Sequence, residues 1–357
     1  MIKVGIIGCG KIADSHAWAI GLIQNAEIVG VCDKEELMAR QFAERFHIKR
    51  YFQNINNMLE ATHPDVVHIT TPPQSHYEIG KCCLTAGCHA FIEKPFTLNS
   101  SEAEELIRFA EVKNLKMTVG NDEQFSHVAI RMRKLIDQGY LGGSPVHMDG
   151  YYCYDLGDER YARAFLSNKT HWVRKLPGQL MQNIISHGVV KIAEYLPGDH
   201  VKVIAHGFTS GFLKNIGENE LIDELRAIII DDQKTTAYFT FSTQMRPSLR
   251  EFRIYGPKNG LIMNQDNHSL IKIPGTSYKS YLEKSIPLNY YAKQYRKNMF
   301  ANAKLFIKRD FYMKEGLKNL TGLFYKSISE DLAVPISYRE ILLTTKIMDE
   351  IFAQVYG

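Results

Sequence analysis

The sequence lacks the features that mark disulfide-bonded, zinc-binding and membrane-spanning proteins. It has six cysteines in 357 residues, and no two of them form a CxxC pair. Most of these cysteines fall in apolar segments, which is typical of buried thiols in a reducing compartment. No apolar run approaches the length of a membrane-spanning helix, and the opening strand-like segment has no signal-peptide pattern. We therefore expect a cytoplasmic protein without a membrane span, a disulfide framework or a metal site.

Internal repeats and low-complexity linkers are also absent, and the overall composition is ordinary. The chain is 45% hydrophobic and 23% charged, with a net charge of +4. Its length fits two domains, or one large one. Because no nucleic-acid-binding module is recognisable and the chain is only mildly basic, we expect no nucleic-acid partner. The charge is uneven, however, since residues 290–326 carry a local +7 and the rest of the chain about −3.

A glycine-rich turn lies near the start of the chain. Residues 2–7 resemble an apolar strand, residues 8–13 read Gly-Cys-Gly-Lys-Ile-Ala, and helical spacing follows. Gly8 permits a tight turn, Gly10 lets backbone N–H groups approach a pyrophosphate, and Ala13 lets the helix pack closely. The positive end of the helix dipole would attract the phosphates. The pattern predicts a dinucleotide site with these candidate contacts: Gly8, Gly10, Lys11 and Ile12.

An acidic residue follows the second strand-like segment. Asp33 directly follows the strand-like residues 27–32 and lies about twenty residues after the glycines. At this position an acid accepts hydrogen bonds from the adenosine ribose hydroxyls. An acid there repels a 2′-phosphate, so NAD is favoured and NADP is less expected. Lys34 and Arg40 could soften that preference. Asp33 could also cap the following helix, and the two roles are compatible.

Strands alternate with helices up to residue 120, which predicts βαβ units and a parallel sheet. Thr71-Pro72-Pro73 follows a strand, and its two prolines predict a rigid corner at the carboxyl edge of the sheet, over the cofactor. A later buried strand stops at Pro95 and places Lys94 at its carboxyl end, where open α/β sheets bind ligands. A partly desolvated Lys94 would have a lowered pKa and serve in proton chemistry. The alternative is an ordinary surface Lys before a turn.

Together these motifs resemble the Gfo/Idh/MocA oxidoreductase family. The similarity covers the first 125 residues strongly and the rest loosely. It rests on five motifs in order and at family-like spacing: Gly8-x-Gly10-x-x-Ala13, Asp33, Thr71-Pro72-Pro73-x-x-His76, Ala86-Gly87-x-His89 and Glu93-Lys94-Pro95. The resemblance implies an NAD(P)-binding Rossmann domain and hydride transfer, typically at a sugar or polyol carbon. It places Lys94 beside the nicotinamide and adds these candidate cofactor contacts: Thr71, Pro72, His76 and Glu93.

The resemblance also implies a second domain of the α+β class with an open, mostly antiparallel sheet. We expect the Rossmann domain over residues 1–122 and a substrate-binding and oligomerisation domain over residues 123–357. Alternating segments between residues 201 and 263 fit such a sheet. Residues 337–356 predict a final amphipathic helix with a capping box, which could pack back on the first domain. Family members assemble through this sheet, which implies a homodimer or homotetramer.

A second candidate motif lies in residues 179–195, whose apolar spacing is helical. Asn183 and His187 are four residues apart and share one helix face. The family has Asp-x-x-x-His here, so this chain keeps the His and has Asn in place of the Asp. The resemblance makes His187 the general base and Asn183 a residue that orients substrate, whereas a lone helical His is otherwise a satisfied core residue. The uncharged Asn183 puts the rate, the direction and catalysis itself in question.

The proposed chemistry needs a base and an oxyanion partner. Imidazole titrates near neutrality and can take the hydroxyl proton while hydride leaves for the nicotinamide. The Lys94 ammonium can hold the substrate oxygen and stabilise the developing alkoxide. Trp172 and Arg174 loosely resemble a family Trp-Arg pair, and Trp172 could stack on a sugar face or anchor its loop. The candidate substrate contacts are Gln124, Trp172 and Arg174.

The motifs predict an NAD-binding protein, and the family resemblance implies an oxidoreductase acting on a secondary hydroxyl or keto carbon of a sugar, sugar nucleotide or polyol. One alternative within the family is glycoside or elimination chemistry assisted by bound NAD. Another is a regulatory NAD-binding protein without turnover, which Asn183 keeps open and which Lys94 and His187 argue against. The sequence does not identify the sugar, the reacting carbon or the physiological direction.

The basic segment, residues 290–326, alternates Lys and Arg with aromatic residues. One interpretation is one or two amphipathic helices with an aromatic inner face and a solvated basic face. A helix on a membrane surface is a second. A third is an excursion from the C-terminal sheet that packs near the substrate cleft and attracts an anionic substrate, such as a nucleotide sugar.

Overall fold

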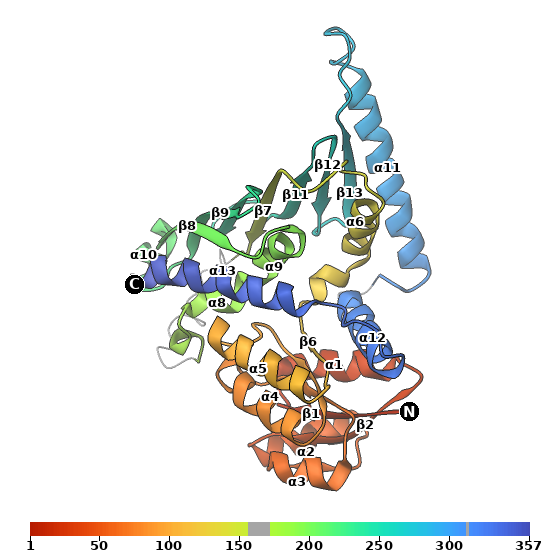
Figure 1. Ribbon diagram of the computed structural model, residues 1–357, viewed down its shortest axis with the longest axis vertical. Helices are drawn as coiled ribbons and strands as arrows, with labels where there is room; N and C mark the ends of the chain where they lie inside the picture. The colour runs from red at the N-terminus through yellow and green to blue at the C-terminus, as the bar shows by residue number, and fades with distance from the viewer. Residues whose placement is uncertain (156–171, 312–313) are drawn as a thin grey trace. The chain divides into compact units, whose positions relative to one another are not determined.

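The computed structural model describes residues 1–155, 172–311 and 314–357, which form two compact units (Figure 1). The first unit contains Met1–Phe125 and Lys314–Lys346, and the second contains Ser126–Met313 and Ile347–Gly357. A late segment of the chain therefore belongs to the first unit. The expected domain boundary after residue 122 stays a prediction.

The first unit is built on a six-stranded parallel sheet with the order β3-β2-β1-β4-β5-β6. Its strands are β1 (Ile2–Ile7), β2 (Ala26–Cys32), β3 (Tyr51–Phe52), β4 (Val66–Ile69), β5 (His89–Ile92) and β6 (Met117–Val119). Strands β4 and β6 are buried along their whole length, as expected for parallel strands covered on both faces. This sheet confirms the predicted Rossmann-type fold.

Helices on the first sheet come from both ends of the chain. They are α1 (Lys11–Gly21), α2 (Glu36–Arg45), α3 (Ile55–Thr62), α4 (His76–Thr85), α5 (Ser100–Val112) and α12 (Glu315–Ser329), with the 3₁₀ turns η1 (Pro73–Ser75) and η2 (Asp122–Phe125). Helices α4 and α5 pack against each other, and α12 packs on α1. The α12 side chain of Phe324 joins the same core as Phe91, with ring centroids 6.0 Å apart.

The second unit contains a seven-stranded sheet with the order β13-β12-β11-β7-β10-β9-β8. Its strands are β7 (His147–Cys153), β8 (Val201–Phe208), β9 (Glu224–Asp231), β10 (Thr236–Ser242), β11 (Arg250–Tyr255), β12 (Asn259–Asn264) and β13 (Ser269–Pro274). Every neighbouring pair is antiparallel except β7 and β10. This confirms the predicted mostly antiparallel sheet, although β13 was not anticipated because its sequence does not alternate strictly.

The described helices of the second unit are α6 (His127–Asp137), α8 (Gln179–Ile184), α9 (Ser186–Tyr195), α10 (Gly211–Asn215) and α11 (Ile286–Ile307), with η3 (Trp172–Lys175). Helix α13 (Tyr338–Tyr356) is shared between the units, and Ser337 Oγ accepts the Glu340 N–H at its start, as the capping box predicts. Helix α9 packs on β7 and β10, while α6 packs on β12 and β13. No helix in the described part of the chain is long and apolar enough to cross a membrane.

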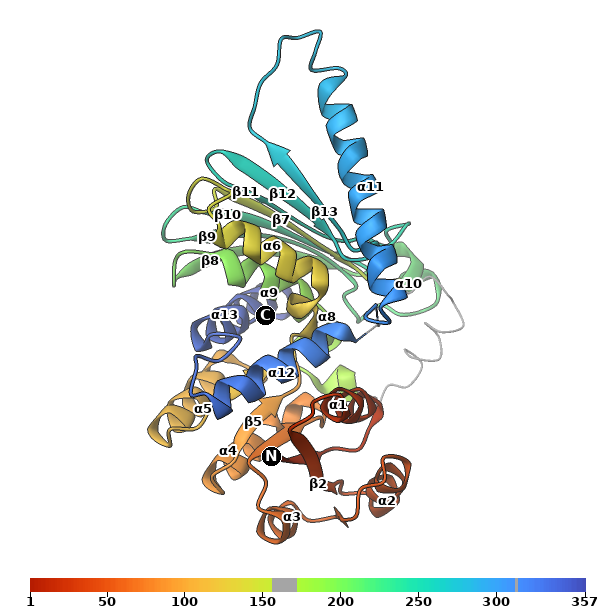
Figure 2. The ribbon, with the colours of Figure 1, turned by 90° about the vertical axis from the view of Figure 1, so that its right-hand side faces the viewer.

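The basic segment forms two helices with different environments. Helix α12 buries Phe324 and Tyr325 in the first unit. Helix α11 runs beside β13 at the edge of the second sheet (Figure 2), and Asn298 is the one buried residue of its 22. Phe300 and Phe306 are 66% and 73% exposed. The prediction of an aromatic inner face is therefore right for α12 and wrong for α11, which contacts the sheet through amide side chains.

Candidate functional site

The glycine-rich turn joins β1 to the N-terminus of α1 at the carboxyl edge of the first sheet. Gly8 has a φ of 95°, and a Cβ there would lie 2.8 Å from the Thr71 nitrogen, so the position needs glycine. A Cβ on Gly10 would meet no atom within 4 Å. Lys11 is exposed and Ile12 is half-buried. An open turn at a helix N-terminus is the geometry that accepts a pyrophosphate, so these residues fit a dinucleotide.

Asp33 connects the end of β2 to this turn. Its Oδ2 accepts the Cys9 N–H at 2.8 Å, and its Oδ1 accepts the Glu35 N–H at 3.0 Å. The following helix α2 has Glu35 as its N-cap, so the predicted capping role of Asp33 is wrong: its carboxylate holds the turn that precedes the helix. Lys34 and Arg40 are exposed. Contact with the ribose stays a prediction for Asp33.

The corner after β4 is tied to the corner after β5 by a buried histidine. The two ring nitrogens of His76 lie 2.9 Å from the carbonyl oxygens of Thr71 and Pro95. Burial lowers the pKa of His76, and the backbone hydrogen bonds oppose that shift. Because β4 and β5 are neighbours, His76 fixes the Thr71 corner against the Lys94-Pro95 corner. Its predicted contact with the cofactor stays a prediction.

Lys94 and Asp122 follow two neighbouring strands, β5 and β6, at the same edge of the sheet. Burial lowers the pKa of Lys94 from its usual value, and the charges of Glu93 and Asp122 oppose that shift. Burial raises the pKa of Asp122 to about 6, although Lys314, with Nζ 3.8 Å from its Oδ2, opposes the rise. Sequence reasoning missed Asp122. Its position after β6, at the carboxyl edge of the sheet, is the signal that could have identified it.

Behind Lys94 lies a buried chain of hydrogen-bonded side chains. Glu93 Oε2 accepts the Lys94 N–H at 3.1 Å, and its Oε1 lies 2.8 Å from His16 Nε2. His16 Nδ1 is 2.7 Å from His68 Nδ1, and His68 Nε2 is 2.9 Å from the Tyr325 hydroxyl. Burial would raise the pKa of Glu93, but the hydrogen bond and charge of His16, together with the charge and backbone N–H of Lys94, lower it. The Glu93 carboxylate thus bonds within the protein, and its predicted cofactor contact stays a prediction.

The second group of candidate residues belongs to the second unit. The expected single helix is interrupted at Ile185, so Asn183 lies in the last turn of α8 and His187 in the first turn of α9. Both side chains are half-buried. The His187 ring stacks on Tyr152, with centroids 5.4 Å apart and an interplanar angle of 15°. Lys191 is buried one turn further along α9, with Nζ 5.3 Å from the same tyrosine ring, and sequence reasoning missed it.

Two of the three candidate substrate contacts, Arg174 and Gln124, have partners within the protein. Arg174 Nη2 lies 2.5 Å from Glu218 Oε2, and both side chains are 12% exposed. Gln124 is buried and donates to Glu340 Oε1 at 2.5 Å. The backbone of Trp172 begins η3. Substrate contact by these three residues stays a prediction. Four polar residues that precede η3 in the sequence lie outside the described residues: Asp158, Arg160, Arg163 and His171.

A known family model matches the N-terminal part of the first unit. Residues 2–121 match the family model described as an oxidoreductase family with an NAD-binding Rossmann fold. The D-glucoside 3-dehydrogenase of Escherichia coli is 31% identical over 142 residues, which are 40% of this chain and 40% of that protein. The matches to curated relatives thus span less than half of those relatives' own length.

Solved structures extend the likeness of fold to the whole chain. The UDP-N-acetylglucosamine 3-dehydrogenase of Acidithiobacillus ferrooxidans has a TM-score of 0.73 at 19% identity, covering 99% of this chain and 98% of that one. The scyllo-inositol dehydrogenase of Lactobacillus casei, solved with NAD(H) and scyllo-inositol, also has a TM-score of 0.73 at 19% identity. The match covers 100% of this chain and 97% of the Lactobacillus casei chain. At these identities the likeness shows a shared fold.

Proposed function

We propose that the chain is an NAD-dependent dehydrogenase or reductase acting on CH–OH groups, because residues 2–121 match the model of an oxidoreductase family with an NAD-binding Rossmann fold. The proposed substrate is a sugar, sugar nucleotide or polyol, reacting at a secondary hydroxyl or keto carbon. One observation carries the proposal: an open glycine turn and a lysine of lowered pKa lie at the same edge of one sheet. Relatives named as D-glucoside and UDP-N-acetylglucosamine 3-dehydrogenases support the substrate class.

The backbone of the glycine turn and the N-terminus of α1 would hold the pyrophosphate of NAD. Asp33 would accept hydrogen bonds from the ribose hydroxyls. A carboxylate has about four lone-pair sites, so Asp33 can do this while it keeps the Cys9 N–H and the Glu35 N–H. Bound NAD would supply the nicotinamide that accepts or returns hydride. NADP is the less favoured cofactor because its 2′-phosphate would meet this carboxylate.

Three side chains have proposed roles toward the substrate. The Lys94 ammonium donates a hydrogen bond to the reacting oxygen and stabilises the charge that develops there. His187 accepts the hydroxyl proton, because imidazole titrates close to neutral pH. Asn183 orients a substrate hydroxyl by hydrogen bonding. Asp122, ionised above about pH 6, favours the ammonium form of Lys94.

Formation of NADH by the purified chain, followed by fluorescence across sugars, polyols and nucleotide sugars, tests this function. We expect net NADH with at least one member of the panel. A product that forms without net NADH would instead identify elimination chemistry in which bound NAD is reduced and reoxidised. Binding of NAD without turnover of any compound would favour the regulatory alternative. Assembly into a dimer or tetramer through the second sheet and a cytoplasmic location belong to the same proposal.

A further inference from the structure

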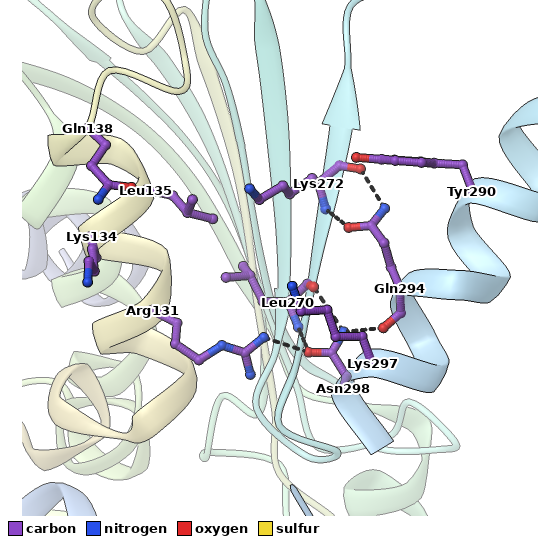
Figure 3. Close-up of a pocket in the computed structure, with 10 residues that line it drawn as sticks. All are labelled: Arg131, Lys134, Leu135, Gln138, Leu270, Lys272, Tyr290, Gln294, Lys297 and Asn298. Atoms are coloured by element: carbon purple, nitrogen blue, oxygen red, sulfur yellow. Dashed lines mark hydrogen bonds between the residues drawn. The ribbon is translucent and has the colours of Figure 1, made fainter. Parts of the chain in front are cut away.

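A cavity of about 520 Å³ lies within the second unit, between α6, β13 and α11 (Figure 3). Its volume is in the range of small-molecule sites. Three structural elements contribute cations to its lining: Arg131 and Lys134 from α6, Lys272 from β13 and Lys297 from α11. None of its ten lining residues, all of them described, is Asp or Glu. The cavity therefore gathers positive charge without a carboxylate to balance it.

Two amide side chains of α11 build one wall of this cavity. Asn298 accepts the Leu270 N–H at 3.2 Å and donates to the Leu270 carbonyl oxygen at 3.0 Å. Gln294 accepts the Lys272 N–H at 2.8 Å and donates to the Lys272 carbonyl oxygen at 3.0 Å. Figure 3 shows these bonds. Strand β13 is at the edge of the sheet, and the two amides bond to its backbone N–H and C=O groups in the way that a neighbouring strand would. They fix α11 on β13 and hold the lining in place.

Uncharged side chains contact two of these cations. Arg131 Nη2 donates to Asn298 Oδ1 at 2.8 Å, and burial lowers the pKa of the arginine. Lys272 Nζ lies 5.1 Å from the centroid of the Tyr140 ring, a cation–π contact. Over the described chain, no carboxylate pairs with any of the four lining cations. By contrast Arg133, also on α6, pairs with Glu194 at 2.6 Å.

We propose that this cavity, here named the α6–α11 pocket, binds the phosphate or diphosphate group of a small molecule. The guanidinium fork of Arg131 matches phosphate oxygens, and the ammonium groups of Lys272 and Lys297 neutralise the second charge. A bound dianion offsets the cost of partly burying Arg131 beside two lysines. The Tyr290 ring and the Leu135 side chain line the same cavity and supply an apolar wall for the attached organic group.

The α6–α11 pocket is separate from the proposed base of the reaction. His187 lies on α9, which packs on β7 and β10, whereas the pocket lies over β13. Strands β12 and β11 stand between β13 and β7. With about 4.8 Å between neighbouring strands, the two positions in the sheet are about 14 Å apart. The inference therefore stands whether or not the proposed hydride transfer is correct.

Calorimetric titration of the full chain with inorganic pyrophosphate tests the pocket. Saturating NAD is present, so that the glycine turn is not the site that responds. We expect one pyrophosphate per chain, and the double variant Lys272→Gln/Lys297→Gln should weaken binding by about tenfold or more. The matched control Lys293→Gln/Lys304→Gln removes the same charge from residues outside the lining and should change binding less than about twofold. Thermal unfolding and circular dichroism check that each variant is folded.

A variant that keeps the charge provides a second measurement. Arg131→Lys keeps the positive charge but loses the planar guanidinium fork, so this variant should bind pyrophosphate more weakly than the unchanged chain does. Because the charge is kept, the dependence of binding on chloride concentration should be the same in both. Three results would overturn the proposal: no binding in the presence of NAD, equal losses in the two double variants, or unchanged binding in Lys272→Gln/Lys297→Gln.

A lipid headgroup carries the same phosphate chemistry, so a vesicle experiment distinguishes the two sources. Flotation with phosphatidic-acid vesicles should leave the chain unbound if the ligand is a soluble phosphate compound. Vesicle binding that Lys272→Gln/Lys297→Gln abolishes would assign the pocket to lipid and contradict a soluble ligand. Vesicle binding that both double variants weaken equally would reflect the general charge of α11 and also contradict it.

Discussion

The two sets of candidate catalytic residues are held in different ways. Lys94 follows a buried strand, with Asp122 in its electrostatic environment and the buried Glu93–His16 pair behind its backbone. His187 lies in the first turn of a helix, and its ring stacks on Tyr152. In the first unit, burial and neighbouring charges shift the pKa of Lys94. In the second unit, stacking on Tyr152 orients the His187 ring. Changes in the first unit should act on charge and pH, and changes in the second on proton transfer and orientation.

Removing the lysine should have the largest effect. Lys94→Ala should abolish turnover of any substrate that is found, because the developing charge on the substrate oxygen loses its cation. The affinity for NAD should remain nearly unchanged. Steady-state kinetics and calorimetry measure the two quantities, with Lys81→Ala, a half-buried lysine on α4 paired with Glu105, as the control. Full activity in Lys94→Ala would remove this residue from the reaction.

Removing the imidazole should have the next largest effect. His187→Ala should lower kcat by about 100- to 10,000-fold, the usual contribution of a positioned acid or base. The control is His206→Ala, an exposed histidine on β8, which should leave kcat unchanged. If His187→Ala keeps full activity, the base lies elsewhere, and Tyr151, Tyr152 and Tyr154 become the candidates.

The charge of Asp33 should separate the two cofactors. NAD(H) should bind more tightly than NADP(H) by about 1–3 kcal/mol, because NADP(H) loses the paired ribose contact. Titration calorimetry with both cofactors measures the difference, and Asp33→Asn should reduce it. Equal affinities in the unchanged chain would refute the role given to Asp33.

Restoring the carboxylate of the family motif should have a smaller effect, of opposite sign. Asn183→Asp should raise kcat by up to about tenfold, because a carboxylate near a reacting group raises its basicity by about one pKa unit. The pH dependence of kcat measured beside Asn183→Ala separates charge from loss of the amide. If kcat of Asn183→Asp does not exceed that of the unchanged chain, the absence of the family's Asp at this position does not limit the rate.

The ionisation of Asp122 should affect stability more than it affects rate. Burial raises its pKa to about 6 in the folded chain, against about 3.9 in the unfolded chain. Stability is therefore lost as the pH rises from about 4 to about 6, because the unfolded state releases this proton first. Asp122→Asn should be more stable than the unchanged chain by about 1–3 kcal/mol above pH 6 and equally stable near pH 4. Urea unfolding across this pH range measures the difference, and a constant difference would contradict the shifted pKa.

Local motifs predicted much of the first unit because their roles depend on a few neighbouring residues. The glycine turn and the proline corner lie where the sequence places them, after β1 and β4. The chain of His16, His68 and Tyr325 could not be found in this way. Its successive members are 52 and 257 residues apart. They lie on α1, β4 and α12, so tertiary packing brings them together.

Amphipathic patterns predicted less in the second unit, because burial depends on the partner that a helix meets. Helices α11 and α12 share a basic and aromatic composition, yet α12 enters a core and α11 meets the edge of a sheet. An edge strand offers backbone N–H and C=O groups, so Asn298 is buried while Phe300 and Phe306 stay exposed. The break at Ile185 likewise left no signal in the apolar spacing.

Transfer of deuterium tests the central claim of hydride transfer most directly. A substrate from the panel would be labelled at its secondary carbon and incubated with the chain and NAD, and mass spectrometry would then be used to examine the cofactor. The account predicts one deuterium in NADH for each molecule of product, with none formed by Lys94→Ala. Product that appears together with unlabelled NADH, or with no NADH, would contradict it.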